Sequence, residues 1–189
     1  MPKRALVLLA EESEEMEAVT IIDILHRAGI EVEIVGIPEN KTIRCNGGVV
    51  VHPTIDIQRA RTRGPFDVIV LPGGLSGAKV LGKHREVGNI LREQDNSGRI
   101  IAAGCAAPVF VLKAHGIGEG KMFTCYPTLV DNLTNDGKHY FSPDNVVIDG
   151  NITTSREPSM AVDFALSIVL QLTDSNKYNE IVKAVRPLR

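Results

Sequence analysis

Cys105 is the residue of this chain whose surroundings most favour chemistry. It stands between Gly104 and the pair Ala106-Ala107, directly after the apolar run at residues 99–103. A strand that turns sharply into a helix can present a nucleophile at the turn, and only small neighbours fit there. The N-terminus of the following helix would favour the thiolate form of Cys105. The alternative is an inert cysteine in the core, a common state of cysteine in globular proteins.

Two adjacent glycines could supply groups that stabilise a reacting oxygen. Gly73 and Gly74 follow the apolar run at residues 67–71. Backbone N–H groups at such a pair can approach an oxyanion closely. An ordinary turn after a strand is, taken by itself, the more common explanation of adjacent glycines.

Glu17 could carry a proton for the same site. It belongs to an acidic run at residues 11–17, which as a whole is typical of the solvated start of a helix. Glu17 follows Met16 at the edge of an apolar stripe, so its side chain could point at the sheet. A carboxyl group partly buried beside Cys105 would have a raised pKa and could hold or move a proton.

The hydrophobic pattern predicts the elements that must position these residues. Short apolar or alternating runs predict strands at 5–10, 30–37, 67–71, 99–103 and 121–124, with a short accessory strand at 48–51 and a hairpin at 146–154. Longer periodic stretches predict helices at 13–28, 80–94, 106–115, 158–172 and 176–185. We expect Ser13 to cap the first helix and Met16, Val19, Ile22 and Leu25 to form its buried stripe.

Strands separated by helices predict an α/β fold, with a mainly parallel sheet and helices on both faces. The 189 residues fit a single domain, because single domains usually have roughly 100–200 residues. Ligands bind at the carboxyl ends of the strands in such sheets. Glu17, Gly73-Gly74 and Cys105 are therefore expected to meet at one edge.

Composition excludes several classes of function. The net charge is −2, and no cluster of Lys and Arg indicates nucleic acid or an anionic membrane as a partner. Three cysteines and five histidines lack the spacing of a disulfide scaffold or a metal site. We therefore expect no metal. No phosphate-binding glycine motif is present either, so we expect no cofactor such as flavin. Cysteine usage indicates a reducing compartment, the cytoplasm, with nucleus and mitochondria left open as further locations.

Arg156 could bind an anion, but a local pair with Glu157 is at least as good an explanation.

Several separated motifs, taken in order, resemble one known family. They are ALVLLA, SEEMEAVTIIDILHRAGIEV, FDVIVLPGG, IIAAGCAAP, TTSREP and AVDFALSIV, and they span nearly the whole chain. The chain resembles the Parkinson disease protein 7 family of protein deglycases and glyoxalases, within the PfpI superfamily. The resemblance implies a flavodoxin-like three-layer sandwich, a homodimer and no cofactor.

The resemblance also implies roles for particular residues. The reactive cysteine of the family falls on Cys105, and its partner carboxylate falls on Glu17. The backbone amides that stabilise an oxyanion fall on Gly74 and Ala106. Further residues expected to line the pocket are Gly73, Tyr126, Arg156 and Pro158.

Four positions depart from the family pattern. Tyr126 replaces a frequent histidine, and a Tyr hydroxyl can donate a hydrogen bond but is a poor base at neutral pH. Glu157 and Ser159 replace glycines, which places a carboxylate near the expected pocket and would oppose thiolate formation and anionic substrates. Gly104 precedes the cysteine where a branched residue is common. Each change bears on rate and substrate more than on fold.

Two functions from different classes follow from the resemblance. The first is a cofactor-independent glyoxalase and protein deglycase that protects against oxidative stress. Its Cys105 would act on methylglyoxal, glyoxal and early glycation adducts, including those on proteins. The alternative is a non-enzymatic redox sensor or redox-dependent chaperone, in which Cys105 is oxidised to a sulfinate. An enzyme regenerates its thiol in each cycle, whereas a sensor consumes it once.

Overall fold

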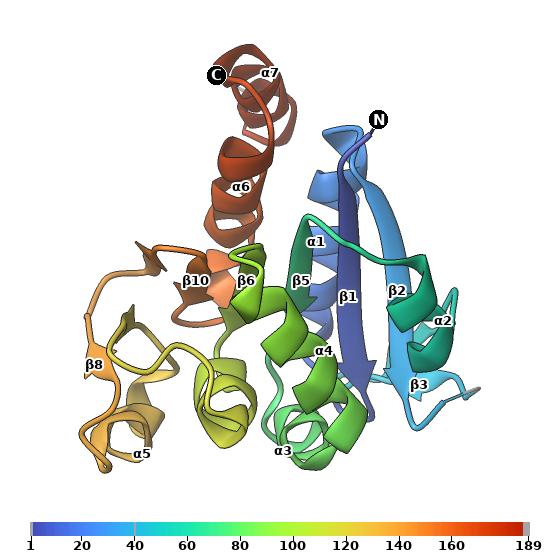
Figure 1. Cartoon of the computed structure of the whole chain (residues 1–189). Helices are drawn as coiled ribbons and strands as arrows, with labels where there is room; N and C mark the ends of the chain where they lie inside the picture. The colour runs from blue at the N-terminus through green and yellow to red at the C-terminus, as the bar shows by residue number, and fades with distance from the viewer. Residues whose placement is uncertain (1, 40, 187–189) are drawn as a thin grey trace.

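One six-stranded sheet organises the chain, in the order β2-β1-β5-β6-β10-β9 (Figure 1). The computed structural model describes residues 2–39 and 41–186. The sheet strands are β1 (Arg4–Ala10), β2 (Glu31–Ile37), β5 (Val68–Leu71), β6 (Ile100–Gly104), β9 (Val146–Asp149) and β10 (Ile152–Ser155). All neighbours pair in parallel except β9, which is antiparallel to β10. The predicted α/β fold with a mainly parallel sheet is confirmed.

Helices cover both faces of this sheet. On one face lie α2 (Ile57–Arg63), α3 (Leu75–Lys83) and α4 (Arg85–Asn96), and on the other α1 (Glu15–Arg27), α6 (Ala161–Leu172) and α7 (Ser175–Val185). Side chains alternate between the faces along each strand, so Leu6 and Leu8 belong to one cluster and Val7 and Leu9 to the other. Because helices cover both faces, β1 is continuously apolar and its residues 5–10 are fully buried.

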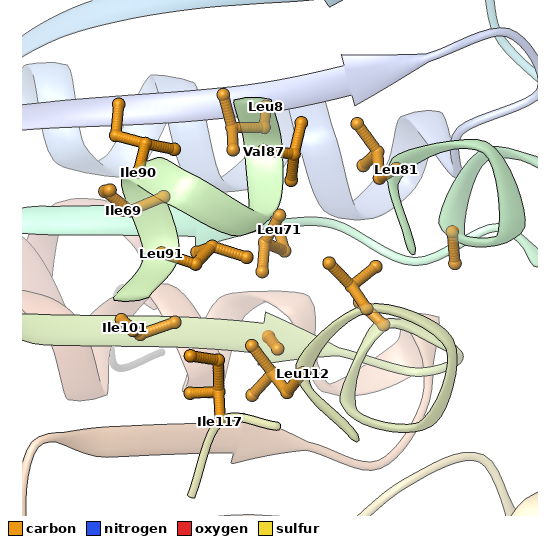
Figure 2. Close-up of a cluster of buried hydrophobic side chains, with 14 of the residues drawn as sticks. Leu8, Ile69, Leu71, Leu81, Val87, Ile90, Leu91, Ile101, Leu112 and Ile117 are labelled. Carbon is orange, nitrogen blue, oxygen red and sulfur yellow. The ribbon is translucent and has the colours of Figure 1, made fainter. Parts of the chain in front are cut away.

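Figure 2 shows the cluster on the α4 face, where side chains from three central strands meet the helices. The labelled residues are Leu8, Ile69, Leu71, Leu81, Val87, Ile90, Leu91, Ile101, Leu112 and Ile117. Burying one such side chain stabilises the fold by roughly 1.5–3 kcal/mol. This packing holds β5 and β6 in place, and it thereby fixes the positions at which the loops that follow these two strands begin.

The first helix differs from the expectation in its cap and in its buried face. Glu14, not Ser13, caps α1, and its side chain accepts a hydrogen bond from the Met16 N–H. Ser13 is buried instead, and its Oγ accepts from the Ala10 N–H at 3.0 Å. Met16 and Val19 are 58% and 49% exposed, so the expected stripe is wrong at these two positions. The buried residues of α1 are Glu17, Ala18, Ile21, Ile24 and Leu25.

Other expected elements are confirmed with changed bounds. The helix expected at 80–94 is two helices, α3 and α4, which meet at His84. The helix expected at 106–115 is a π-helical turn, Pro108–Leu112, followed by a 3-10 turn, Lys113–His115. The hairpin at 146–154 is the pair β9–β10. The strand expected at 121–124 shortens to β7 (Met122–Phe123), and the accessory strand at 48–51 shortens to β4 (Val50–Val51).

The pattern did not predict the short elements outside the main sheet. These are β3 (Ile43–Arg44), which pairs with β4 (Val50–Val51), and β8 (Tyr140–Phe141), which pairs with β7 (Met122–Phe123). A short helix, α5 (Val130–Thr134), and the 3-10 turns Pro127–Leu129 and Pro158–Met160 complete the description. Elements of two to five residues have too few periodic positions to be recognised from sequence.

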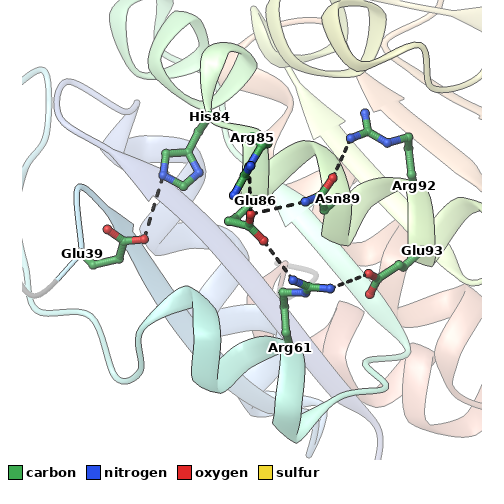
Figure 3. A network of polar contacts seen from close by, with 8 residues as sticks. All are labelled: Glu39, Arg61, His84, Arg85, Glu86, Asn89, Arg92 and Glu93. Carbon is green, nitrogen blue, oxygen red and sulfur yellow. Dashed lines mark hydrogen bonds and ion pairs between the residues drawn. The ribbon is translucent and has the colours of Figure 1, made fainter.

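A network of ion pairs joins α2 to α4 on the outside of the sheet (Figure 3). The Arg61 guanidinium contacts Glu86 and Glu93, each at 2.9 Å. His84, at the junction of α3 and α4, lies 3.9 Å from Glu39. Pairs at the surface contribute at most about 1 kcal/mol each. The network therefore orients these helices more than it stabilises them.

Within the described residues, none of the helices has the length and apolar character needed to cross a membrane.

Candidate active site

Cys105 occupies a strained turn at the end of β6. Its φ is +54°. This left-handed conformation costs an L-residue roughly 1–2 kcal/mol of free energy. Neighbouring strands and loops hold the turn, since the Cys105 N–H donates to Ser155 O at 2.8 Å and Cys105 O accepts from the Tyr126 N–H at 2.9 Å. The side chain is 9% exposed. Strain maintained in this way is typical of functional positions.

Glu17 reaches the same point from α1. It is 2% exposed, and its Oε2 accepts a hydrogen bond from the Gly73 N–H. Its Oε1 is buried without a hydrogen-bond partner among the described residues. Burial raises the pKa of Glu17 to about 7, with a smaller rise from Glu14, against hydrogen bonds from Gly73 and Cys105 that lower it. A carboxyl group with such a pKa can accept or donate a proton at neutral pH.

The backbone N–H groups of Gly74 and Ala106 are directed at the Cys105 thiol, where both lower its pKa. Burial and the charge of Glu17 nevertheless raise the pKa of Cys105 to about 12. The Ala106 N–H group, at the start of the following helix, lowers the pKa of the Cys105 thiol, as expected, but desolvation and the neighbouring carboxylate outweigh it, so the net shift is upward. The thiol must lose its proton to a nearby base during the reaction, and Glu17 is placed to receive it.

Glycines leave the space that this arrangement needs. A Cβ atom added at Gly73 would lie 2.5 Å from Cys105 Cβ and 2.9 Å from Glu17 Oε2. One added at Gly104 would lie 2.8 Å from Glu17 Oε2. Gly104, which the sequence marks as a departure, thus adjoins the buried carboxyl group. At Gly74, φ is +95° and an added Cβ would contact Glu12 O at 2.5 Å.

We expect Gly73→Ala to lower turnover at least about tenfold and to destabilise the fold by about 1–3 kcal/mol, as overpacking of a tight site does. The new methyl group would separate Cys105 from Glu17. Gly64→Ala is the matched control, because its added Cβ would meet nothing closer than 3.7 Å. Thermal unfolding and steady-state kinetics measure both effects. Equal behaviour of the two variants would show that the contact at Gly73 does not matter.

A pocket of about 340 Å³ opens above Cys105. Gly74, Ala106, Tyr126 and Pro158 line it, as the sequence predicts. Gly73 is not part of the lining and lies behind Cys105, against Glu17. Residues that sequence reasoning did not place in the lining are Glu12, Glu14, Asn46, Leu75, Ser76, Thr128 and Leu129.

Arg156 does not line this pocket, which corrects the expectation for that residue. Its guanidinium approaches Pro143 O at 3.4 Å and Glu157 at 4.0 Å. The local pair with Glu157 therefore describes it better than an anion site. Glu157 also accepts a hydrogen bond from the Ser159 hydroxyl at 2.8 Å and is outside the lining as well. The Glu157 carboxylate, which was expected near the pocket, thus contacts Ser159 and Arg156 outside the lining.

The remaining candidate groups do not join the site. Cys45 and Cys125 are buried, and burial raises the pKa of each, that of Cys125 to about 11. None of the five histidines of the chain is among the residues that line the pocket. Among the described residues, no group of three or more His, Cys, Asp or Glu side chains could hold a metal ion.

The fold and the site define a class, namely flavodoxin-like α/β proteins with a cysteine at a strained turn after a central strand. The model of the DJ-1/PfpI family matches residues 3–171, and the chain belongs to this family. The resemblance drawn from the sequence motifs is thereby confirmed.

Three relatives illustrate the match. Protein dj-1beta of Drosophila melanogaster is 41% identical over 185 residues, which cover 98% of this chain and 97% of the relative. Its crystal structure superposes with a TM-score of 0.94 at 39% identity, covering 100% of both chains. The glutathione-independent glyoxalase DJR-1.2 of Caenorhabditis elegans is 37% identical, over 96% of this chain and 95% of the relative. The structure of oxidized Toxoplasma gondii DJ-1 has a TM-score of 0.91 at 32% identity, over 97% of both chains.

Proposed function

We propose that this chain is a glutathione-independent glyoxalase that converts methylglyoxal to lactate. The observation that carries the proposal is the buried Glu17 carboxyl group, which adjoins the Cys105 thiol and has one oxygen without a hydrogen-bond partner in the described part of the chain. The Gly74 and Ala106 N–H groups converge on the same sulfur. A nucleophile, a proton carrier and two donors for an oxyanion thus meet below one pocket. The relative named as a glutathione-independent glyoxalase supports the assignment.

The chemistry proceeds by addition, isomerisation and hydrolysis. The Cys105 sulfur attacks the aldehyde carbon as Glu17 takes the thiol proton, and the Gly74 and Ala106 amides stabilise the oxyanion. Protonation of that oxygen gives a hemithioacetal and returns Glu17 to its carboxylate form. Glu17 then removes the hydrogen from this carbon, and the neighbouring ketone oxygen takes a proton from water, so that an enediol forms. Glu17 returns its proton to the second carbon while the hydroxyl group on the first carbon loses its proton to water, which gives a thioester. Water cleaves the thioester to lactate and the free thiol.

The decisive measurement is lactate formation from methylglyoxal in the absence of glutathione. We expect many equivalents of lactate per equivalent of protein, because hydrolysis of the thioester restores Cys105. One equivalent or less would contradict catalysis. Heat-unfolded protein is the control for slow reactions of methylglyoxal with accessible thiols and amines. We extend the proposal to deglycation of proteins in the cytoplasm. Cys105 would use the same chemistry on hemithioacetals and aminocarbinols that methylglyoxal has already formed on protein side chains.

A second candidate is a redox sensor, which the position of Cys105 favours. It alone of the three cysteines lines the pocket described above, and a protonated Glu17 could donate a hydrogen bond to a sulfinate. One of the similar structures is described as oxidized DJ-1. This candidate predicts a mass gain of two oxygens on Cys105 at low peroxide, with Cys45 and Cys125 unmodified. Equal oxidation of all three would contradict it.

We further propose that the chain forms a homodimer through an apolar patch made of Met16, Val19, Val49 and Val50. These side chains are between 45% and 58% exposed. The Val49 N–H donates to Glu15 Oε1 at 3.5 Å, which joins the β3–β4 loop to α1, the helix that carries Met16 and Val19. Exposed apolar side chains that gather in this way are typical of protein interfaces.

Val19→Glu is expected to weaken the dimer at least about tenfold, since it places a charge within the apolar patch. Sedimentation equilibrium measures the change in Kd. Val80→Glu on α3, where the valine is 40% exposed, is the matched control. Dimerisation that withstands Val19→Glu would place the interface elsewhere.

A further inference from the structure

Among the described residues, those at the mouth of the pocket carry negative charge and no positive charge. Glu12 and Glu14 belong to its lining, and no lysine, arginine or histidine of the described chain does. The charge of Glu14 reaches the reacting groups, since it raises the pKa of both Glu17 and Cys105. Arg156, the nearest cation that the sequence suggested, is held by Pro143 O and Glu157 outside the lining.

The backbone of Glu12 is in a strained conformation. Its φ is +62°, and among the described residues only Cys105 shares this conformation without being glycine. Hydrogen bonds fix the turn on both sides, from the Glu12 N–H to Arg44 O at 2.9 Å and from the Ser13 N–H to Ala10 O at 3.0 Å. Glycine or asparagine fits such a position better. A charged residue kept in a strained turn beside a pocket points to a role for its side chain.

We propose that Glu12 and Glu14 form a charge filter, so that the pocket admits neutral and cationic carbonyl compounds and rejects those that carry a carboxylate. The meaning of this filter for catalysis rests on the proposed glyoxalase function. Neutral α-oxoaldehydes, and carbonyl adducts next to an amino or guanidino group, would enter. Glyoxylate and other α-oxo acids would be excluded. Glu12 and Glu14 are specificity residues in this scheme and take no part in proton transfer.

Charged thiol reagents test the filter without any catalytic turnover. The cation trimethylammonium-ethyl methanethiosulfonate and the anion sulfonatoethyl methanethiosulfonate undergo the same reaction with a thiol. The thiolate attacks the sulfenyl sulfur, a mixed disulfide forms, methanesulfinate leaves, and the thiol proton passes to the buffer. Because both reagents need the same thiolate, the ratio of their rates does not depend on the pKa of Cys105. Mass spectrometry of the Cys105 peptide follows each reaction, with Cys105→Ser as the background.

We expect the cationic reagent to modify Cys105 at least about tenfold faster than the anionic one, after correction for their rates with a small neutral thiol. One unit charge at about 6 Å in water changes a local concentration about threefold, so reagents two charge units apart differ about tenfold per carboxylate. Glu12→Gln and Glu14→Gln should each lower the ratio about three- to tenfold. Salt at about 1 M should also lower it, because the Debye length falls to about 3 Å.

Glu180→Gln is the matched control. It removes one negative charge from α7, which lies at the opposite end of the molecule from the start of α3 (Figure 1), and should leave the ratio unchanged. A wild-type ratio near one, or a ratio that Glu180→Gln lowers as much as Glu12→Gln does, would overturn the proposal. The expected ratio together with no lactate from methylglyoxal would retain the filter and contradict the glyoxalase function.

Glu12→Gly separates the filter from a structural role. Glycine relieves the left-handed conformation, so the melting temperature should stay equal or rise while the ratio of the two rates falls as in Glu12→Gln. Glyoxylate can add to the thiol but cannot be isomerised to a new product, so it can act only as an inhibitor. If the enzyme turns over methylglyoxal, glyoxylate should inhibit both variants more strongly than the wild type. A lower melting temperature with an unchanged ratio would show that Glu12 serves only the turn.

Discussion

Replacing Cys105 with serine is expected to reduce lactate formation from methylglyoxal at least about a thousandfold, to the background rate. A serine hydroxyl is a far weaker acid than a thiol, and Glu17, with a pKa of about 7, is too weak a base to ionise it. Steady-state assays without glutathione measure the loss. The hydroxyl is smaller than the thiol, so the strained turn and the thermal unfolding of the protein should change little.

Cys125→Ser provides the matched control for this substitution. Cys125 is fully buried, and burial raises the pKa of its thiol to about 11, yet it does not line the pocket. We expect wild-type turnover from this variant, with at most a modest loss of stability. Turnover that persists in Cys105→Ser and disappears in Cys125→Ser would show that Cys105 is not the nucleophile.

Glu17→Gln is expected to lower kcat about 100- to 10,000-fold, the range that a positioned acid–base group contributes. Glutamine keeps the shape of the side chain and can still accept the Gly73 hydrogen bond, but it cannot take a proton from Cys105 or from the substrate. Mass spectrometry after a single turnover should show whether any adduct remains on Cys105. Full activity in this variant would exclude Glu17 as the proton carrier.

The same substitution should change how stability depends on pH. Burial raises the folded-state pKa of Glu17 to about 7 from an ordinary value of 4.5. The contribution of Glu17 to stability is therefore fully present below about pH 4.5 and is lost as pH rises through 7. At pH 8 the loss is on the order of 3 kcal/mol. Glu17→Gln should remove this dependence and be the more stable protein at pH 8, as denaturant titrations at pH 5 and 8 would show.

The fold could be predicted from the sequence because strands at the centre of its sheet, β1 and β5 above all, are nearly continuous apolar runs. Residues 5–10 and 68–71 are buried on both faces, so each strand lacks the polar positions that would confuse it with a surface element. The face of α1 could not be predicted in the same way. Met16 and Val19 are as apolar as the residues of a buried stripe, but they form an exposed patch, and periodicity alone cannot separate the two.

The candidate site could be anticipated in part. Small residues around Cys105 and Gly74 are a local signal, and the structure places both in one pocket. Asn46 and Thr128 reach that pocket through contacts between distant segments, among them the Asn46 N–H to Ser13 O bond of 3.1 Å, for which the sequence holds no local signal. The raised pKa of Cys105 depends on burial and on the distance to Glu17, and neither quantity can be derived from the order of residues.

The bond between the Cys105 N–H and Ser155 O has a consequence for the life of the chain before it is complete. The turn that holds the thiol is anchored on β10, which is made fifty residues later than Cys105, and Glu17 comes from the first helix. A nascent chain that ends before β10 therefore lacks an anchor of the reactive geometry, and its thiol behaves as an ordinary cysteine. A change in the reactivity of Cys105 away from that of an ordinary cysteine would therefore report that enough chain has emerged from the ribosome to close the sheet, and it offers a chemical measure of completed folding.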